Sequence, residues 1–190
     1  MKFSVHSIVG FSIFVLALQM HVCLGPDDLL IRYAHHPRVR AFLDTLAHCE
    51  GTLHDEGYRT IFGGVLFEEY NDHPRMVVCV PYKQGMEQLC SSAAGRYQIL
   101  AKTWDKVAPR IGARMFNPSN QDRAAVQILI DRDALHDILQ GRFGVALTKL
   151  TDEWASLPGS PYGQPTPYTM AELFEVYKER YTHYKTEGKS

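Results

Sequence analysis

The segment of residues 39–51 constrains the fold most, because apolar residues recur along it at helical spacing and the pattern ends on a charge. At about 100° per residue, one face of the predicted helix carries Phe42, Leu43, Leu46 and Ala47. Glu50 falls on the same face, within the stripe that would meet a core. Gly51 follows it and is a typical residue at a helix C-terminus. The sequence therefore predicts a helix that directs a carboxylate toward the interior.

The predicted position of Glu50 favours a raised pKa. The C-terminal end of a helix dipole is negative and disfavours a second negative charge, and partial burial also penalises the ionised form. A carboxyl group in this setting can hold its proton long enough to act as a general acid. The helix could instead reach the surface at its end and leave Glu50 in water, where most glutamates lie.

The composition indicates a single domain that does not bind nucleic acid. With 190 residues, 45% of them hydrophobic, the chain is long enough to bury one core. Twenty Lys and Arg residues nearly balance twenty-one Asp and Glu residues, and the basic residues form no long run. The nine histidines show no metal-ligand spacing, so no metal or other cofactor is expected.

An apolar run at the N-terminus, residues 8–24, predicts an export segment. The run is shorter and more polar than an ordinary membrane span. We therefore expect residues 1–25 to be either a cleaved signal peptide or a weak signal anchor that associates transiently with the inner membrane. Residues 26–37 show no clear periodicity and are expected to form a linker. The protein is predicted to act in the periplasm or cell envelope.

Export changes the meaning of the cysteines, because disulfides persist in oxidising compartments. The chain has four, Cys23, Cys49, Cys79 and Cys90, and their spacing matches no zinc site. Four cysteines allow three complete pairings. A disulfide between Cys79 and Cys90 is our first choice, because it closes a short local loop.

The rest of the chain is predicted to be mainly helical, with a small antiparallel sheet after the first helix. Short β-branched and aromatic runs indicate two or three strands within residues 57–80, and residues 81–90 are expected to be a loop. Helical spacing and cap residues then predict helices near residues 96–107, 117–130, 133–140, 145–150 and 170–184. This is an α+β fold in which the sheet flanks a cleft with Glu50 at its edge.

Other residues could complete a carbohydrate-cleaving site, since glycosidases commonly use two carboxylates. The candidates for the second are Glu68, Glu69 and Asp72, and none stands out by spacing. Small residues within 92–98 would let the backbone approach a ligand closely, but they equally suit a helix cap. Trp154 and Tyr162 could stack on sugar rings or serve as hydrophobic plugs for the domain.

Several of these segments, taken in order, resemble the phage lambda lysozyme (endolysin) family. They are residues 41–52, 64–67, 70–75, 94–98, 154–159 and 162–164, and the resemblance spans about residues 38–185. The chain departs from the family in two places: it carries an apolar N-terminal run, and Cys49 precedes the glutamate.

The resemblance implies a lysozyme-like catalytic domain over residues 38–187 that acts on bacterial peptidoglycan as a monomer. Such enzymes are lytic transglycosylases: they cut the bond between N-acetylmuramic acid and N-acetylglucosamine without water and leave a 1,6-anhydro sugar. By resemblance, Glu50 is the catalytic acid, and Gly95, Arg96, Tyr97 and Gln98 line the glycan groove. Trp154 and Tyr162 match motif positions. The alternatives are a hydrolytic muramidase that uses Asp72 or Glu69 as well, and an inactive cell-wall-binding protein.

Overall fold

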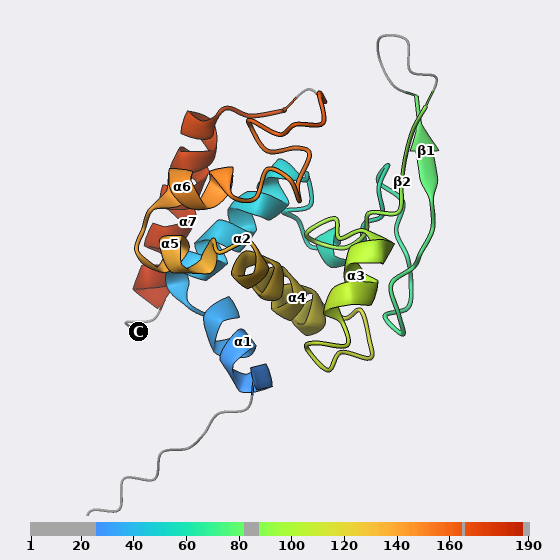
Figure 1. Ribbon diagram of the computed structural model, residues 1–190, viewed down its shortest axis with the longest axis horizontal. Coiled ribbons are helices and arrows are strands. Elements are labelled where there is room, and N and C mark those ends of the chain that lie inside the picture. Colours follow the sequence, from blue (N-terminus) through green and yellow to red (C-terminus); the bar gives the residue numbers. More distant parts are fainter. Residues whose placement is uncertain (1–25, 82–87, 165, 188–190) are drawn as a thin grey trace, which may run out of the picture.

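The computed structural model describes residues 26–81, 88–164 and 166–187. Most helices gather in one lobe, and α3 with the two-stranded sheet forms the other (Figure 1). Within these ranges no helix is both long and apolar enough to span a membrane. The expected export segment lies outside the described residues.

Helix α2, Pro37–Cys49, occupies the centre of the helical lobe and confirms the first sequence prediction. It begins at His36, whose side chain accepts a hydrogen bond from the backbone N–H of Arg38. Its inward face is buried over Val39, Ala41, Phe42, Leu43, Leu46 and Ala47. The helix ends at Glu50, where Gly51 adopts a φ of 71° and the N–H of Thr52 returns to the carbonyl of Ala47 at 2.8 Å. Only glycine adopts this left-handed conformation at low cost, so Gly51 fixes the turn.

The remaining helices of this lobe surround α2. Helix α7, Met170–Glu187, packs along α2, and α4, Pro118–Asp131, contributes the buried Ala124, Ala125 and Leu129. The short helices α5, Leu135–Leu139, and α6, Phe143–Thr148, connect α4 to a long loop. These elements were predicted to within a few residues. The side chain of Asn117 caps α4, and Thr169 and Glu172 form a capping box at the start of α7.

The predicted linker over residues 26–37 is wrong, because most of this segment is helix α1, Pro26–Ala34. Leu30 and Ala34 are 5% and 8% exposed, and the helix packs against α4. These two residues stand four apart and supply a narrow apolar contact. Two apolar residues are too few to give a helical periodicity that can be recognised in the sequence. Packing against α4, rather than an amphipathic pattern, stabilises this helix.

The sheet consists of β1, Val78–Val80, and β2, Leu89–Ser91, in antiparallel register. Cys79 lies directly opposite Cys90, and the two form the predicted disulfide. The sheet was expected within residues 57–80 and a loop over 81–90, yet β2 lies in the expected loop. Residues 57–66 instead form the 3-10 turn η1, Gly57–Arg59, and isolated bridges such as Thr60 to Leu66.

The predicted helix over residues 96–107 is also shorter than expected, because α3 covers only Ala101–Val107. Gly95 and Gln98 have φ values of 76° and 46°, which are incompatible with a right-handed helix. Ala94 and Ile99 pair across a tight turn instead. The N-cap position of α3 is Leu100, and the hydroxyl of Ser92 accepts a hydrogen bond from the N–H of Ala101 at 3.2 Å across the turn.

Replacement of Gly95 by Ala tests how tightly this turn is packed. A Cβ atom at Gly95 would lie 2.1 Å from Oε1 of Gln121, whereas one at Gly64, with a φ of 86°, would meet nothing within 4 Å. Both variants force Ala into a left-handed conformation, at about 1–2 kcal/mol. The clash should add at least about 1 kcal/mol to the loss for Gly95→Ala. Urea denaturation measures both, and equal losses would contradict the tight packing.

Candidate functional site

Glu50 lies at the junction of α2 and the long loop that follows α6. Its backbone N–H bonds to the carbonyl of Leu46 at 2.9 Å, so the main chain still belongs to the helix end. The hydroxyl of Ser156 donates a hydrogen bond to Oε1 of Glu50. Among the described residues, Ser156 is the only hydrogen-bond partner of this carboxyl group. Two segments 106 residues apart in sequence therefore meet at the acid.

The surroundings of Glu50 make it a weak acid. Burial raises the pKa of Glu50 to about 7, and the hydrogen bond from Ser156 lowers it by a smaller amount. The raised pKa expected from the sequence is thus confirmed, and burial is its first cause. At neutral pH a large fraction of the molecules carry a protonated Glu50, as a general acid requires.

Cys49 fixes the backbone of the same serine. Its thiol is 5% exposed and donates a hydrogen bond to the carbonyl of Ser156, with 3.3 Å between sulfur and oxygen. Burial raises the pKa of Cys49 to about 11, so the group is a thiol and not a thiolate. Adjacent residues at the C-terminal end of α2, Cys49 and Glu50, therefore hold the carbonyl and the hydroxyl of Ser156. Ser156 was not among the predicted site residues, since no spacing in the sequence connects residue 156 to residue 50.

Trp154 anchors the loop that carries Ser156. Its ring is 4% exposed, and its indole N–H donates a hydrogen bond to the carbonyl of Tyr97 at 2.8 Å. Leu157 is fully buried on the other side of the serine. Of the two readings for Trp154, the structure favours the hydrophobic plug over a sugar-stacking surface. Its effect on the site is to position Ser156.

The segment expected to line the glycan groove is largely structural. The ring of Tyr97 is 2% exposed, and its hydroxyl donates to Asp122 at 2.6 Å. The amide of Gln98 donates to the carbonyls of Thr60 and Gly95 at 3.1 and 3.0 Å. Gly95 faces the side chain of Gln121. In this conformation Tyr97 therefore offers almost no surface to a glycan.

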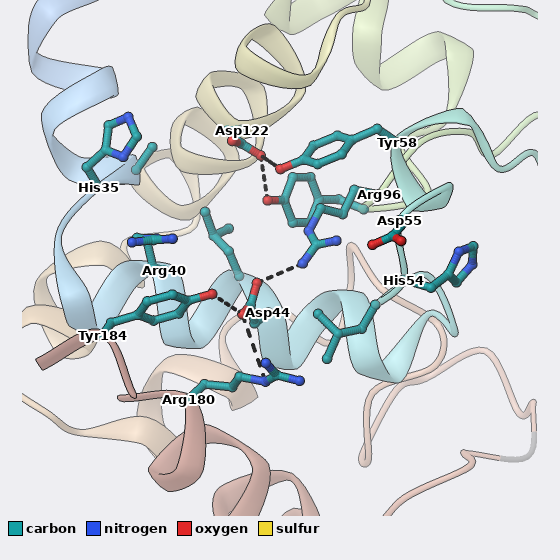
Figure 2. A pocket seen from close by; sticks show the side chains of 14 residues that line it. His35, Arg40, Asp44, His54, Asp55, Tyr58, Arg96, Asp122, Arg180 and Tyr184 are labelled. Carbon is teal, nitrogen blue, oxygen red and sulfur yellow. Dashed lines mark hydrogen bonds and ion pairs between the residues drawn. The ribbon is translucent and has the colours of Figure 1, made fainter. Parts of the chain in front are cut away.

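Arg96 and Tyr97 line a polar cavity that is not built around Glu50. Figure 2 shows this cavity, and its lining includes neither Glu50 nor Ser156. Nη2 of Arg96 lies 2.8 Å from Oδ1 of Asp44 in an almost buried ion pair. Arg96 is therefore committed to the packing of α2.

Tyr162 remains available to a ligand. It is 55% exposed, and its hydroxyl donates to the carbonyl of Asp152 at 2.7 Å, which orients the ring without covering it. Of the two aromatic candidates, it alone keeps a face open for stacking on a sugar.

The candidate second carboxylates do not contact Glu50 in the described chain. Asp72 accepts hydrogen bonds from the indole of Trp104 at 2.9 Å and from Nε of Arg75 at 3.0 Å. Burial opposes ionisation of Asp72, but these bonds and one from the backbone of His73 outweigh it and lower its pKa. Glu68 and Glu69 are exposed. The described residues also contain no group of three or more His, Cys, Asp or Glu side chains that could hold a metal ion.

Comparisons with known proteins connect the chain to a family. A family model described as "Endolysin" matches residues 40–183. The endolysin of Escherichia phage lambda is 42% identical over 131 residues, covering 66% of this chain and 80% of that protein. The endolysin of Escherichia phage P2 is 35% identical over 156 residues, covering 75% and 92%.

Two solved structures share the fold. Bacteriophage lambda lysozyme complexed with a chitohexasaccharide has a TM-score of 0.69 and 38% identity, covering 76% of this chain and 94% of the other. A second structure of lysozyme from bacteriophage lambda has a TM-score of 0.62 and 34% identity, covering 80% and 95%. The chain therefore has a lambda lysozyme-like fold.

The raised pKa of Glu50 predicts that Glu50→Gln stabilises the protein at high pH. A carboxyl whose pKa rises from 4.5 to about 7 on folding costs stability as pH increases through this window. Glutamine carries no charge, so the variant should gain up to about 3 kcal/mol above pH 7, reduced by the partial exposure of Glu50, and nothing below pH 4.5. Chemical denaturation at pH 4 and 8 measures the difference. The exposed Glu68→Gln is the control, and a gain independent of pH would contradict the assignment.

Proposed function

Because the chain belongs to the endolysin family, we propose that it cleaves the glycan strands of bacterial peptidoglycan with Glu50 as the catalytic acid. The family model extends over residues 40–183 and so includes Glu50, Ser156 and Tyr162. The observation that carries the proposal is the state of Glu50: a carboxyl at the end of α2, with a pKa of about 7, oriented by a single hydroxyl.

We propose a lytic transglycosylation in two proton transfers. Protonated Glu50 first gives its proton to the oxygen that joins N-acetylmuramic acid to N-acetylglucosamine, and the C1–O bond breaks. The Glu50 carboxylate then takes the proton of the C6 hydroxyl of muramic acid, while O6 forms a bond to C1. The products are an N-acetylglucosamine end and a 1,6-anhydro end, and no water is consumed. Glu50 leaves the cycle protonated as it entered.

The geometry is consistent with one carboxylate performing both steps. A pKa near the working pH suits a group that must both give and accept a proton. The bond from Ser156 holds one carboxyl oxygen, so the other is free to face the glycosidic oxygen. The substrate proposal also draws on the lambda lysozyme structure that contains a chitohexasaccharide. Tyr162 is the exposed aromatic surface on which a sugar ring would stack.

The hydrolytic alternative requires a second carboxylate to activate water or attack C1. Asp72 is committed to Trp104 and Arg75, and Glu69 accepts a hydrogen bond from the amide of Asn71 at 2.6 Å. Neither contacts Glu50 in the described part of the chain. This arrangement favours transglycosylation. A catalytically silent wall-binding protein would have no need of a half-buried acid with a raised pKa.

Glu50→Gln should reduce cleavage of purified peptidoglycan by at least about 10²-fold, because general acid catalysis typically contributes 10² to 10⁴-fold. Glu69→Gln, which removes an exposed carboxylate, should cost far less. Mass spectrometry of the products should find muropeptides lighter than hydrolysis products by one water. Reducing muramic acid ends would establish the hydrolase, and full activity in Glu50→Gln would reject Glu50 as the acid.

Ser156→Ala should move the pH profile of activity as well as lower it. The hydrogen bond from Ser156 lowers the pKa of Glu50, so its removal should raise this pKa above that of the wild type. The alkaline limb of kcat/KM, which reports loss of the acid's proton, should shift to higher pH. Thr151→Ala, in the same loop, should leave the limb in place. An unchanged limb in Ser156→Ala would show that the serine does not act on Glu50.

A further inference from the structure

A polar cavity lies apart from the proposed catalytic acid, between α1, α2, α4, α7 and the turn around η1. Its volume is about 480 Å³, which falls in the range of small-ligand sites. Figure 2 shows that its lining side chains come from both ends of the described chain, with Arg180 and Tyr184 of α7 facing Asp44 of α2. Glu50 and Ser156 do not line it. The proposed cleavage reaction gives this cavity no role.

The fixed charges of the cavity nearly cancel. Its lining contains three arginines and three aspartates, namely Arg40, Arg96, Arg180, Asp44, Asp55 and Asp122. A phosphate or another simple anion would meet three carboxylates, and a simple cation would meet three guanidinium groups. A ligand that carries both signs of charge is complementary to such a lining, as long as each sign meets its opposite.

Two of the three carboxylates already accept hydrogen bonds from side chains of the protein itself. Asp44 is 7% exposed and accepts bonds from Arg96, at 2.8 Å, and from the hydroxyl of Tyr184. Asp122 accepts the hydroxyls of Tyr58 and Tyr97 at 2.8 and 2.6 Å. These hydrogen-bonded groups form the floor of the cavity and keep it polar and rigid.

The groups at the rim have capacity left for a ligand. Arg180 approaches Asp44 only at 4.0 Å, so most of its five N–H donors have no acceptor in the described chain. Arg40 lies over the ring of Tyr184 at 3.8 Å and forms one bond, at 3.3 Å, to Glu187. Asp55 is exposed and forms no hydrogen bond or ion pair with any residue in the described ranges. In Figure 2, Arg40 and Arg180 lie on either side of Tyr184, and Asp55 lies across the cavity from Arg40.

We propose that this cavity binds a short peptide that carries both signs of charge, with one carboxylate at Arg40, another at Arg180 and an amine at Asp55. Neutral glycan lacks both groups. The peptides attached to peptidoglycan carry free carboxylates and a free amine, so they are the source that the chemistry favours, and this identification rests on the proposed function. The site would hold the protein on the peptide part of the wall while Glu50 acts on the glycan.

The test is a titration of the full chain with N-acetyl-alanyl-γ-glutamyl-diaminopimelic acid, followed by NMR of the backbone amides. We expect saturable shifts at residues that line the cavity. Arg180→Gln and Asp55→Asn should each weaken binding by about tenfold, the value of one charged hydrogen bond. Lys178→Gln and Glu179→Gln, on the exposed face of α7, should leave the affinity unchanged.

Two further ligands test which charged groups of the peptide the cavity recognises. The same peptide with its amine acetylated should bind as weakly as the intact peptide binds Asp55→Asn, and inorganic phosphate should not compete. The proposal is overturned by an absence of saturable shifts at about 10 mM peptide, by equal affinity for the acetylated peptide, or by competition from phosphate. Cleavage of peptide-free glycan strands is measured separately. If that cleavage persists without peptide binding, only this inference fails; if binding persists without cleavage, the proposed reaction fails instead.

Discussion

The hydrogen bond from the indole of Trp154 to the carbonyl of Tyr97 holds together the parts of the structure on which the site depends. It joins the loop after α6 to the turn before α3, 57 residues away in sequence. The same turn is tied to the end of α2, because the hydroxyl of Thr52 bonds to the carbonyls of Ala47 and Arg96. Three segments thus converge behind Glu50. Their convergence buries the carboxyl and brings Ser156 within reach of it.

The protein handles its inward-facing acids in different ways. Asp44 is balanced by the guanidinium of Arg96, and Asp122 by two phenol hydroxyls. Glu50 receives one serine hydroxyl and no cation within the described residues. A buried carboxylate without a cation is the least favourable of these cases. Burial without a cation therefore raises the pKa of Glu50 to about 7, where its proton can exchange at neutral pH.

Sequence reasoning succeeded where one local pattern determined the outcome. The apolar stripe of α2 and the glycine after it placed Glu50 correctly, and the short Cys79 to Cys90 spacing identified the disulfide. It failed where a contact between residues far apart in sequence determined the structure. Trp154 is a plug because Tyr97 offers it a buried carbonyl, and α1 is helical because α4 covers two of its residues. Ser156 could not be identified, since its role exists only after the loop has folded onto α2.

The disulfide between Cys79 and Cys90 stabilises the smaller lobe, where backbone hydrogen bonds alone would not keep the strands paired. Strands of three residues form too few ladder bonds to stay paired unaided. A covalent link at their middle residues keeps the two arms in register, and in the loop-entropy view a closure of this size contributes about 2–3 kcal/mol. The stability of this hairpin therefore depends on the redox state of its two cysteines as well as on its sequence. Under reducing conditions the two strands would lose their covalent link, whereas under oxidising conditions the link holds them in register.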